Sequence, residues 1–235
     1  MTASEMPASA QIARRVNSFV ILRSKKRRHC STTFIALEKF PCTVAAYGNV
    51  TPVSLLMKEF DPDIVSYTPG ADFEDPEGIP RNQRAIDSCI PILCKYKKGT
   101  ECWELFPEDD TDPPVDARRL RLLGEKAAGV GAVAAAFTAE DAHRLSQRYA
   151  NCVMLNGMIR GARIEEYDCR REHDAVLDVC EKRGRTHLYE LCQVLSHDPA
   201  MVMSETARMI RDGILKTELN RKAFTLVSPL EIASL

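Results

Sequence analysis

The sequence lacks long apolar runs and has no excess of charge of either sign. No apolar run approaches the roughly 18 residues that a membrane-spanning helix needs, and the N-terminal segment MTASEMPASA has no apolar signal-peptide core. Lys and Arg number 32 against 33 Asp and Glu, which argues against a uniformly basic nucleic-acid binder. We therefore expect a cytoplasmic protein with no membrane partner.

Several motifs with known chemistry are also missing. The nine cysteines include no C-x-x-C pair, the five histidines form no H-E-x-x-H pattern, and there is no G-x-S-x-G elbow. A zinc site of the usual spacing and a serine hydrolase elbow are therefore unsupported. Gly129-Val130-Gly131 precedes a strand-like run and has no third glycine, so it predicts a tight turn and not a dinucleotide site. We expect reduced thiols, most of them in the core.

What is present is enough apolar sequence, 45% of 235 residues, for one large domain or two small ones. Residues 1–32 form a basic N-terminal arm around a short apolar run. It is typical either of a solvated tail or of a segment that contacts phosphates. Its candidate DNA-contacting residues are Arg14, Arg15, Lys25, Lys26, Arg27 and Arg28.

Residues 33–165 predict an α/β domain with a mixed sheet flanked by helices. Two apolar segments separated by Pro41 precede a helix over 53–60, which Asp61-Pro62 ends. Strands over 85–94 and 101–106 flank a Lys97-Lys98-Gly99 turn. A helix over 118–128, a strand over 129–137 and a helix over 139–149 follow, the last with Thr138 as N-cap.

Residues 166–235 predict a small winged-helix domain. Apolar residues recur at helical spacing in three short segments, with Gly184 and Gly213 at two ends and Asp198-Pro199 opening the third. Two strands, over 214–219 and 223–227, then follow. Helix, helix, helix, hairpin is the chain order of a winged helix-turn-helix.

In that arrangement the third helix is the recognition element. Its expected polar face carries Ser204, Glu205, Arg208 and Arg211, and the wing tip carries Arg221 and Lys222. The four basic residues are candidates for DNA contact. Because acidic residues accompany the two arginines of the helix, we favour protein contact or weak DNA binding over sequence-specific readout.

Two carboxylates on neighbouring strands are the candidate catalytic groups. Asp87 and Glu104 flank the expected hairpin, where they could hold Mg²⁺ or Mn²⁺ for phosphodiester hydrolysis. Acidic pairs on hairpins are common, so this spacing alone is weak evidence.

The wider pattern resembles the TnsA family, the endonuclease subunits of heteromeric transposases of bacteria. The resemblance implies a restriction-endonuclease-like domain followed by a winged-helix domain, with DNA, an integrase-type transposase subunit and an AAA+ regulatory ATPase as partners. The segments that carry it, in chain order, are SLLMKEFDPDIVSY (54–67), the strand with Asp87, WELFP (103–107), FTAEDAHRLSQRYANCVML (137–155) and RDGILKTELNRKAFTLVSP (211–229).

The family's site implies a helix glutamate, a strand aspartate matched by Asp87, and an acidic-x-Lys element whose first member is Glu104. Here Phe106 occupies the lysine position, and the glutamate position falls near Thr51, with no acidic residue between 48 and 58. A phenylalanine can neither orient the attacking water nor stabilise charge on the phosphate. We therefore expect lost or weakened nuclease activity, unless Lys95, Lys97 or Lys98 substitutes for the missing lysine.

Three functions remain open from the sequence. The first is a TnsA-like subunit that binds DNA and protein partners with impaired cleavage. The second is an active metal-dependent endonuclease that cuts transposon ends. The third is a winged-helix transcription regulator whose α/β domain senses a ligand.

Overall fold

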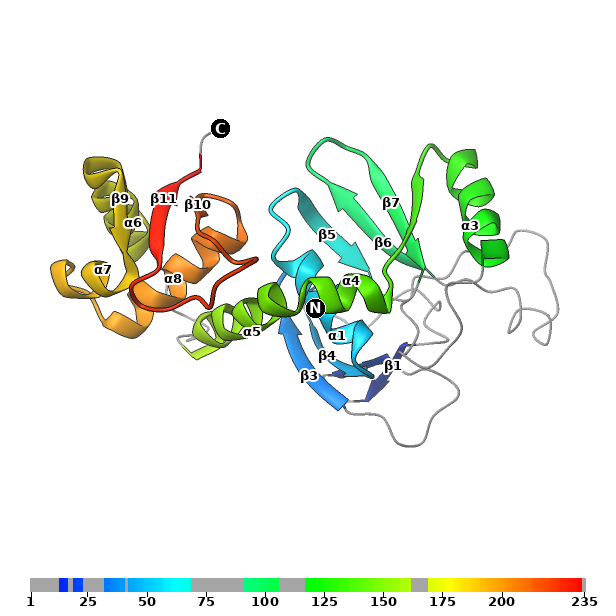
Figure 1. Cartoon of the computed structure of the whole chain (residues 1–235), viewed down its shortest axis with the longest axis horizontal. Coiled ribbons are helices and arrows are strands. Elements are labelled where there is room, and N and C mark those ends of the chain that lie inside the picture. The colour runs from blue at the N-terminus through cyan, green and yellow to red at the C-terminus, as the bar shows by residue number, and fades with distance from the viewer. Residues whose placement is uncertain are drawn as a thin grey trace, which may run out of the picture. The chain divides into compact units, whose positions relative to one another are not determined.

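The structure is a computed structural model of the chain, and it describes residues 13–16, 19–22, 32–40, 42–68, 91–105, 117–161 and 169–233. It is a mixed α/β protein (Figure 1). Contacts divide the chain into two compact units: unit 1 comprises Met1–Leu55 and Asp63–His143, and unit 2 comprises Leu56–Pro62 and Arg144–Leu235. Within the described ranges, no helix is both long and apolar enough to cross a membrane.

The first sheet of unit 1 has the strand order β1-β2-β4-β3. The strands β1 and β2 pair antiparallel, as do β3 and β4, and β2 runs parallel to β4. The two apolar segments expected around Pro41 are confirmed as β3 and β4. The strands are β1 (Ala13–Val16), β2 (Phe19–Leu22), β3 (Thr32–Leu37) and β4 (Cys42–Tyr47).

The expected basic arm is only partly described. The backbone of Arg14 and Arg15 lies in β1 and pairs with β2, so this part of the arm is a strand and not a solvated tail. Its hydrogen-bonding partner is the apolar run over 19–22, so the backbone groups of the two segments satisfy each other. The other candidates, Lys25, Lys26, Arg27 and Arg28, lie outside the described residues.

A second, mixed sheet of unit 1 follows helix α1 (Val50–Glu59) and has the order β5-β6-β7-β8. The first three strands are antiparallel neighbours, and β8 joins β7 in parallel after the crossover helix α3 (Ala117–Gly129). The expected mixed sheet flanked by helices is thus confirmed. Its strands are β5 (Ile64–Thr68), β6 (Pro91–Tyr96), β7 (Glu101–Leu105) and β8 (Val133–Ala136).

The two faces of this sheet differ. On one face, Trp103 and Leu105 of β7 pack against Leu123 and Ala127 of α3 in a small buried cluster. Because side chains alternate along a strand, Glu104 lies on the opposite face. There it shares its side of the sheet with Ile92, its direct partner on β6.

Two local sequence signals are confirmed in this unit. The hairpin turn closes with the Tyr96 amide donating to the Thr100 carbonyl at 3.0 Å, and Gly99 has a φ of 78° that other residues rarely adopt. Thr138 is the N-cap of helix α4 (Ala139–Arg144): its hydroxyl accepts from the Asp141 amide, while the Asp141 carboxylate accepts from the Thr138 amide. This is the reciprocal pattern of a capping box.

Unit 2 contains the three expected helices of the last third, plus a strand that the sequence analysis missed. Gly184 and Gly213 end two of the helices with positive φ, and the Asp198 carboxylate accepts from the Ala200 amide at the start of the third. The elements are α6 (Arg170–Arg183), β9 (Arg185–His187), α7 (Leu188–Val194), α8 (Pro199–Arg211), β10 (Leu215–Lys216) and β11 (Pro229–Ile232).

The expected hairpin of unit 2 is misplaced in the sequence analysis. The strand pairing with β10 is β11 and not residues 223–227, and β11 also pairs with the short β9 to give the order β10-β11-β9. Residues 217–228 form the loop between β10 and β11, hereafter the β10–β11 loop. Its apolar Phe224 is 3% exposed, and the Phe224 amide donates to the side chain of Asn151 instead of to a strand.

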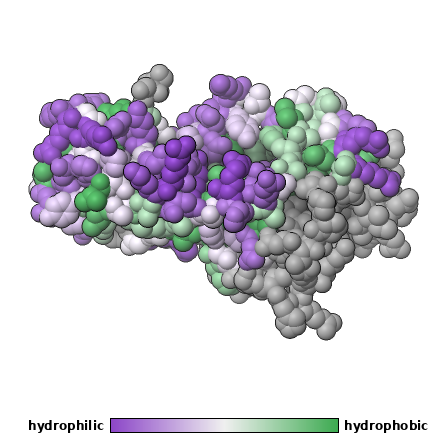
Figure 2. Space-filling view, viewed as in Figure 1, coloured by the Kyte–Doolittle hydropathy of each residue, from purple (hydrophilic) through white to green (hydrophobic). Residues whose placement is uncertain are grey.

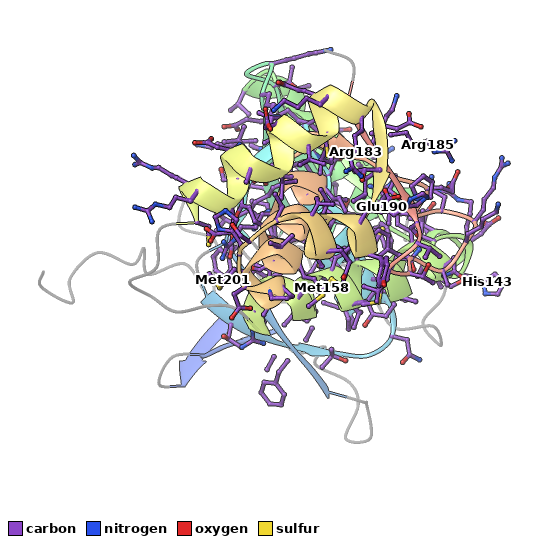
Figure 3. The ribbon with its side chains drawn as sticks, turned by 90° about the vertical axis from the view of Figure 1, so that its left-hand side faces the viewer. His143, Met158, Arg183, Arg185, Glu190 and Met201 are labelled. Carbon is purple, nitrogen blue, oxygen red and sulfur yellow. The ribbon has the colours of Figure 1, made fainter. Side chains whose placement is uncertain are left out.

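Helix α5 (Ser146–Gly161) belongs to unit 2, whereas the sequence analysis placed the domain boundary after residue 165. It packs on α8, and Leu155 and Ile159 are both buried. Figure 3 labels Met158 on α5 and Met201 on α8, the two helices that pack together. The apolar pattern of α5 did not reveal this partner, because the residues that cover it lie at least 40 positions later in the chain.

Candidate functional site

Glu104 is the expected site residue that the structure describes in detail. It lies on β7, an inner strand of the mixed sheet, and is partly buried. The hydroxyl of Ser54 on α1 donates a hydrogen bond to Glu104 Oε1 at 3.0 Å, and Ser54 is fully buried. The face of the sheet that carries Glu104 is therefore the face toward α1.

The position of the missing helix glutamate is occupied by a hydroxyl group. Thr51 precedes Ser54 by three residues on α1, so the two side chains lie on the same side of the helix, and Thr51 is 4% exposed. The first acidic residue along α1 is Glu59, which belongs to unit 2 and lies 3.8 Å from Arg211. Glu59 therefore pairs with Arg211, and the donor from α1 that bonds to Glu104 is the neutral Ser54 hydroxyl.

The sequence analysis left open that a lysine of the hairpin supplies the charge missing at position 106. The structure does not support this role for Lys95. Lys95 is directly opposite Glu101, so both are on the α3 side of the sheet, and their charged groups are 3.9 Å apart. Glu104 is on the other side. Lys97 and Lys98 are exposed in the turn, and the three residues from Glu101 to Glu104 add about 10 Å of strand between that turn and the carboxylate.

The other members of the expected metal site lie outside the described residues. These are Asp87, the second proposed ligand, and Phe106, which occupies the lysine position. Within the described ranges no group of three His, Cys, Asp or Glu side chains could hold a metal ion. Glu104 alone supplies fewer oxygen ligands than Mg²⁺ or Mn²⁺ requires, so the metal site remains a prediction that depends on Asp87.

In unit 2, the expected recognition face of α8 is buried. Ser204 is 0% exposed, Glu205 7% and Arg211 8%. The Ser204 hydroxyl donates to the Ile159 carbonyl of α5 at 3.3 Å. Arg211 donates two hydrogen bonds to the Asp212 carboxylate, at 2.8 and 3.1 Å. These polar residues are satisfied inside unit 2, so α8 does not present them to a ligand as the sequence analysis expected.

Arg208 is also engaged, although it is less buried. Its Nη1 donates to Glu205 Oε2 at 3.3 Å and to the Cys169 sulfur at 3.2 Å. The second oxygen of Glu205 is 2.9 Å from Nδ1 of His173. Both arginines expected on the recognition helix thus hold α8 against other parts of unit 2.

The β10–β11 loop keeps its expected basic residues on the surface. Arg221 and Lys222 are exposed, and the side chain of Asn151 on α5 hydrogen-bonds to the backbone of the loop. The Asn151 amide donates to the Leu219 and Lys222 carbonyls at 2.8 Å each, and its oxygen accepts from the Phe224 amide at 2.9 Å. An asparagine can satisfy three backbone groups in this way because it carries both donors and an acceptor.

Two further exposed arginines were not predicted as candidates. Arg183 ends α6 and Arg185 begins β9, and they lie close together in Figure 3. Arg185, Glu231 and Lys216 are aligned across the three strands, with both cations within 4.0 Å of the Glu231 carboxylate. The signal in the sequence was the basic cluster KRGR at 182–185. This cluster is typical of an ordinary helix end, and only the structure shows that strands lie beside it.

Comparison with known proteins adds no family assignment. The chain matches no protein-family model, and no curated protein matches it.

Proposed function

We propose that this chain is a TnsA-like subunit of a DNA transposition complex, which binds DNA and protein partners and has lost or weakened nuclease activity. The observation that carries the proposal is the placement of Glu104 on an inner strand facing α1, with Ser54 and Thr51 on that helix. The order α1, three antiparallel strands, α3 and a parallel β8 agrees with the restriction-endonuclease-like domain that the resemblance implies.

Impaired cleavage follows from the groups around Glu104. A two-carboxylate site with a nearby lysine stabilises the negative charge that develops on the phosphate. Here the Ser54 hydroxyl of the helix bonds to Glu104, Lys95 lies on the other face of the sheet, and the sequence has Phe106 at the lysine position. Losing one such electrostatic contributor typically lowers the rate by about 10² to 10³-fold, and this chain lacks more than one.

The structure of unit 2 favours contact with DNA phosphates over the reading of base sequence. The order α6, β9, α7, α8, β10, β11, with β9 beside β11, agrees with a winged helix. In such a domain the helix equivalent to α8 would enter the major groove, but α5 and the buried Arg211–Glu59 pair occupy its polar side. We infer that unit 2 contacts DNA only through phosphates, from the exposed Arg183, Arg185, Arg221 and Lys222.

A salt titration of DNA binding tests this proposal. Full-length protein is titrated into a labelled 30-base-pair duplex between about 50 and 200 mM salt, and anisotropy is recorded. Phosphate contacts predict sequence-independent binding whose salt slope falls by about 1 for each removed contact, as in Arg221→Ala and Lys222→Ala. The matched control is Arg208→Ala, whose side chain is engaged inside unit 2 and which leaves the slope unchanged.

The three functions make different predictions in this titration. Binding to one palindromic site as a dimer, at salt concentrations that abolish binding to other sequences, would favour the regulator. No binding to any duplex would contradict the proposed DNA-binding role. Genes for an integrase-type transposase and an AAA+ ATPase beside the gene for this chain would support the proposed partners.

A further inference from the structure

Cys94 and Cys102 lie directly opposite each other across the β6–β7 hairpin. Neither is in a disulfide bond. The Tyr96 amide donates to the Thr100 carbonyl, and hydrogen-bonded pairs alternate along an antiparallel ladder, so Cys94 and Cys102 form the next hydrogen-bonded pair after Tyr96 and Thr100. The Cα atoms of such a pair are about 5.5 Å apart, within the range of about 4.4–6.8 Å that a disulfide spans.

We propose that Cys94 and Cys102 are a redox-sensitive dithiol, which a two-electron oxidant such as a peroxide converts to a cross-strand disulfide. The inference rests on strand register and burial, and it holds whether or not the protein acts in transposition. It assigns a modification to the hairpin that also carries Glu104, two residues beyond Cys102 on the same side of the sheet.

Accessibility makes Cys102 the sulfur that reacts first. Cys102 is partly exposed, whereas Cys94 is 2% exposed. Val133, which pairs with Cys102 from the edge strand β8, is 63% exposed, so this side of the sheet is open toward β8. Figure 2 shows pale green, moderately apolar surface over the part of unit 1 that holds the β5-β6-β7-β8 sheet. A small neutral oxidant can therefore reach Cys102 before it reaches Cys94.

The proposed chemistry balances in two steps. The Cys102 thiolate attacks one oxygen of hydrogen peroxide, the O–O bond breaks, and hydroxide leaves and takes up the thiol proton as water, giving a sulfenic acid. The Cys94 sulfur then attacks the Cys102 sulfur, the S–O bond breaks, and the hydroxyl leaves with the second thiol proton as water. Two thiols lose two electrons in total, and the peroxide gains them.

The strand geometry favours a reversible bond over a permanent one. Opposite Cβ atoms in an antiparallel pair are about 4.5–5.5 Å apart, whereas a disulfide needs about 3.8 Å. The two strands must therefore move together locally when the bond forms. A strained disulfide is more easily reduced than an unstrained one, so thiol reductants should reopen it.

Peptide mapping of the full-length protein tests the proposal. Folded, reduced protein is treated with hydrogen peroxide, remaining thiols are blocked with N-ethylmaleimide in denaturant, and trypsin cleaves after Lys95 and Lys98 between the two cysteines. Because the tryptic peptide over 85–95 also carries Cys89, its fragment-ion spectrum assigns the linked sulfur to Cys94 or to Cys89. We expect one dominant disulfide-linked peptide pair joining Cys94 to Cys102, which dithiothreitol releases. Cys152 is an internal reference because burial raises the pKa of its thiol to about 12, and it should be recovered as the maleimide adduct.

Two variants sharpen the result, and wild-type mapping alone can overturn the proposal. Cys102→Ser should abolish the linked pair, whereas Cys192→Ser, which removes another partly exposed thiol, should retain it. Recovery of Cys94 as its maleimide adduct, with Cys102 over-oxidised or joined to a different cysteine, would show that the two sulfurs do not pair.

Discussion

The hydroxyl of Ser54 on α1 donates a hydrogen bond of 3.0 Å to the carboxylate of Glu104 on β7, fifty residues later in the chain. This contact fixes the helix to the face of the sheet that carries the candidate site. It also gives the carboxylate a neutral partner where the resemblance to the TnsA family implies a glutamate. The contact therefore stabilises the fold and does not add a metal ligand.

Replacing Ser54 with Ala should lower the free energy of unfolding by about 1.5 kcal/mol, because a hydrogen bond to a carboxylate is lost. Urea denaturation of Ser54→Ala, Glu104→Ala and the double variant measures the coupling. The two losses should not add, since each single change already removes the bond. Strict additivity would show that the hydrogen bond contributes nothing.

Asn151 should control the order of the β10–β11 loop. Asn151→Ala leaves two carbonyls and the Phe224 amide without this partner, so unfolding should become easier by about 3 kcal/mol. Hydrogen exchange at the Phe224 amide should accelerate as well. Gln147→Ala is the control, because its contact to Asn151 is long at 3.4 Å, and it should leave that exchange rate unchanged.

Arg211 should matter more to stability than any exposed arginine of unit 2. Its side chain is 10% exposed and lies between Asp212 and Glu59, and Glu59 is itself 1% exposed. Arg211→Met removes a cation that lies 3.8 Å from the buried Glu59 carboxylate and should cost about 3 kcal/mol. Arg185→Met removes only an exposed pair with Glu231 and should cost less than about 1 kcal/mol. Equal costs in urea denaturation would contradict this account.

The Thr186 hydroxyl, followed by His187, holds the pKa of Glu190 below its usual value. A lowered carboxylate pKa stabilises the fold above the unfolded-state pKa, and this contribution is lost as pH falls through the folded-state pKa. In Thr186→Val the pKa of Glu190 should rise toward its usual value in an NMR titration. Thr217→Val is the control, because no hydrogen-bond partner of the Thr217 hydroxyl is found among the described residues.

Local signals in the sequence predicted those elements whose partners are close along the chain. Thr138 and Asp141 cap a helix from three residues apart, and Asp198-Pro199 opens another. The Lys97-Lys98-Gly99 turn predicted the hairpin, and the register of that hairpin determines which side of the sheet carries Glu104. In each case a few neighbouring residues determine the backbone, so propensity and pattern were sufficient.

Long-range partners account for what the sequence analysis missed. Glu205 and Arg211 belong to the set of polar residues expected on the exposed side of the helix, and only the folded chain brings His173 and Glu59 to them. Phe224 lies in a run with strand-like composition, but Asn151 takes its amide and the true strand begins at Pro229. Such pairings join residues more than thirty positions apart, and no local pattern encodes them.

The most direct test of the proposed function is a combined binding and cleavage assay. The protein is incubated with DNA carrying the ends of its element, the companion transposase and Mg²⁺ or Mn²⁺, and complexes and strand breaks are resolved on gels. An impaired nuclease-like subunit predicts a protein–DNA complex that Asp87→Ala leaves unchanged, with little or no strand cleavage attributable to this chain. Complete cleavage of the ends, which Asp87→Ala and Glu104→Gln both abolish, would contradict it and establish an active endonuclease.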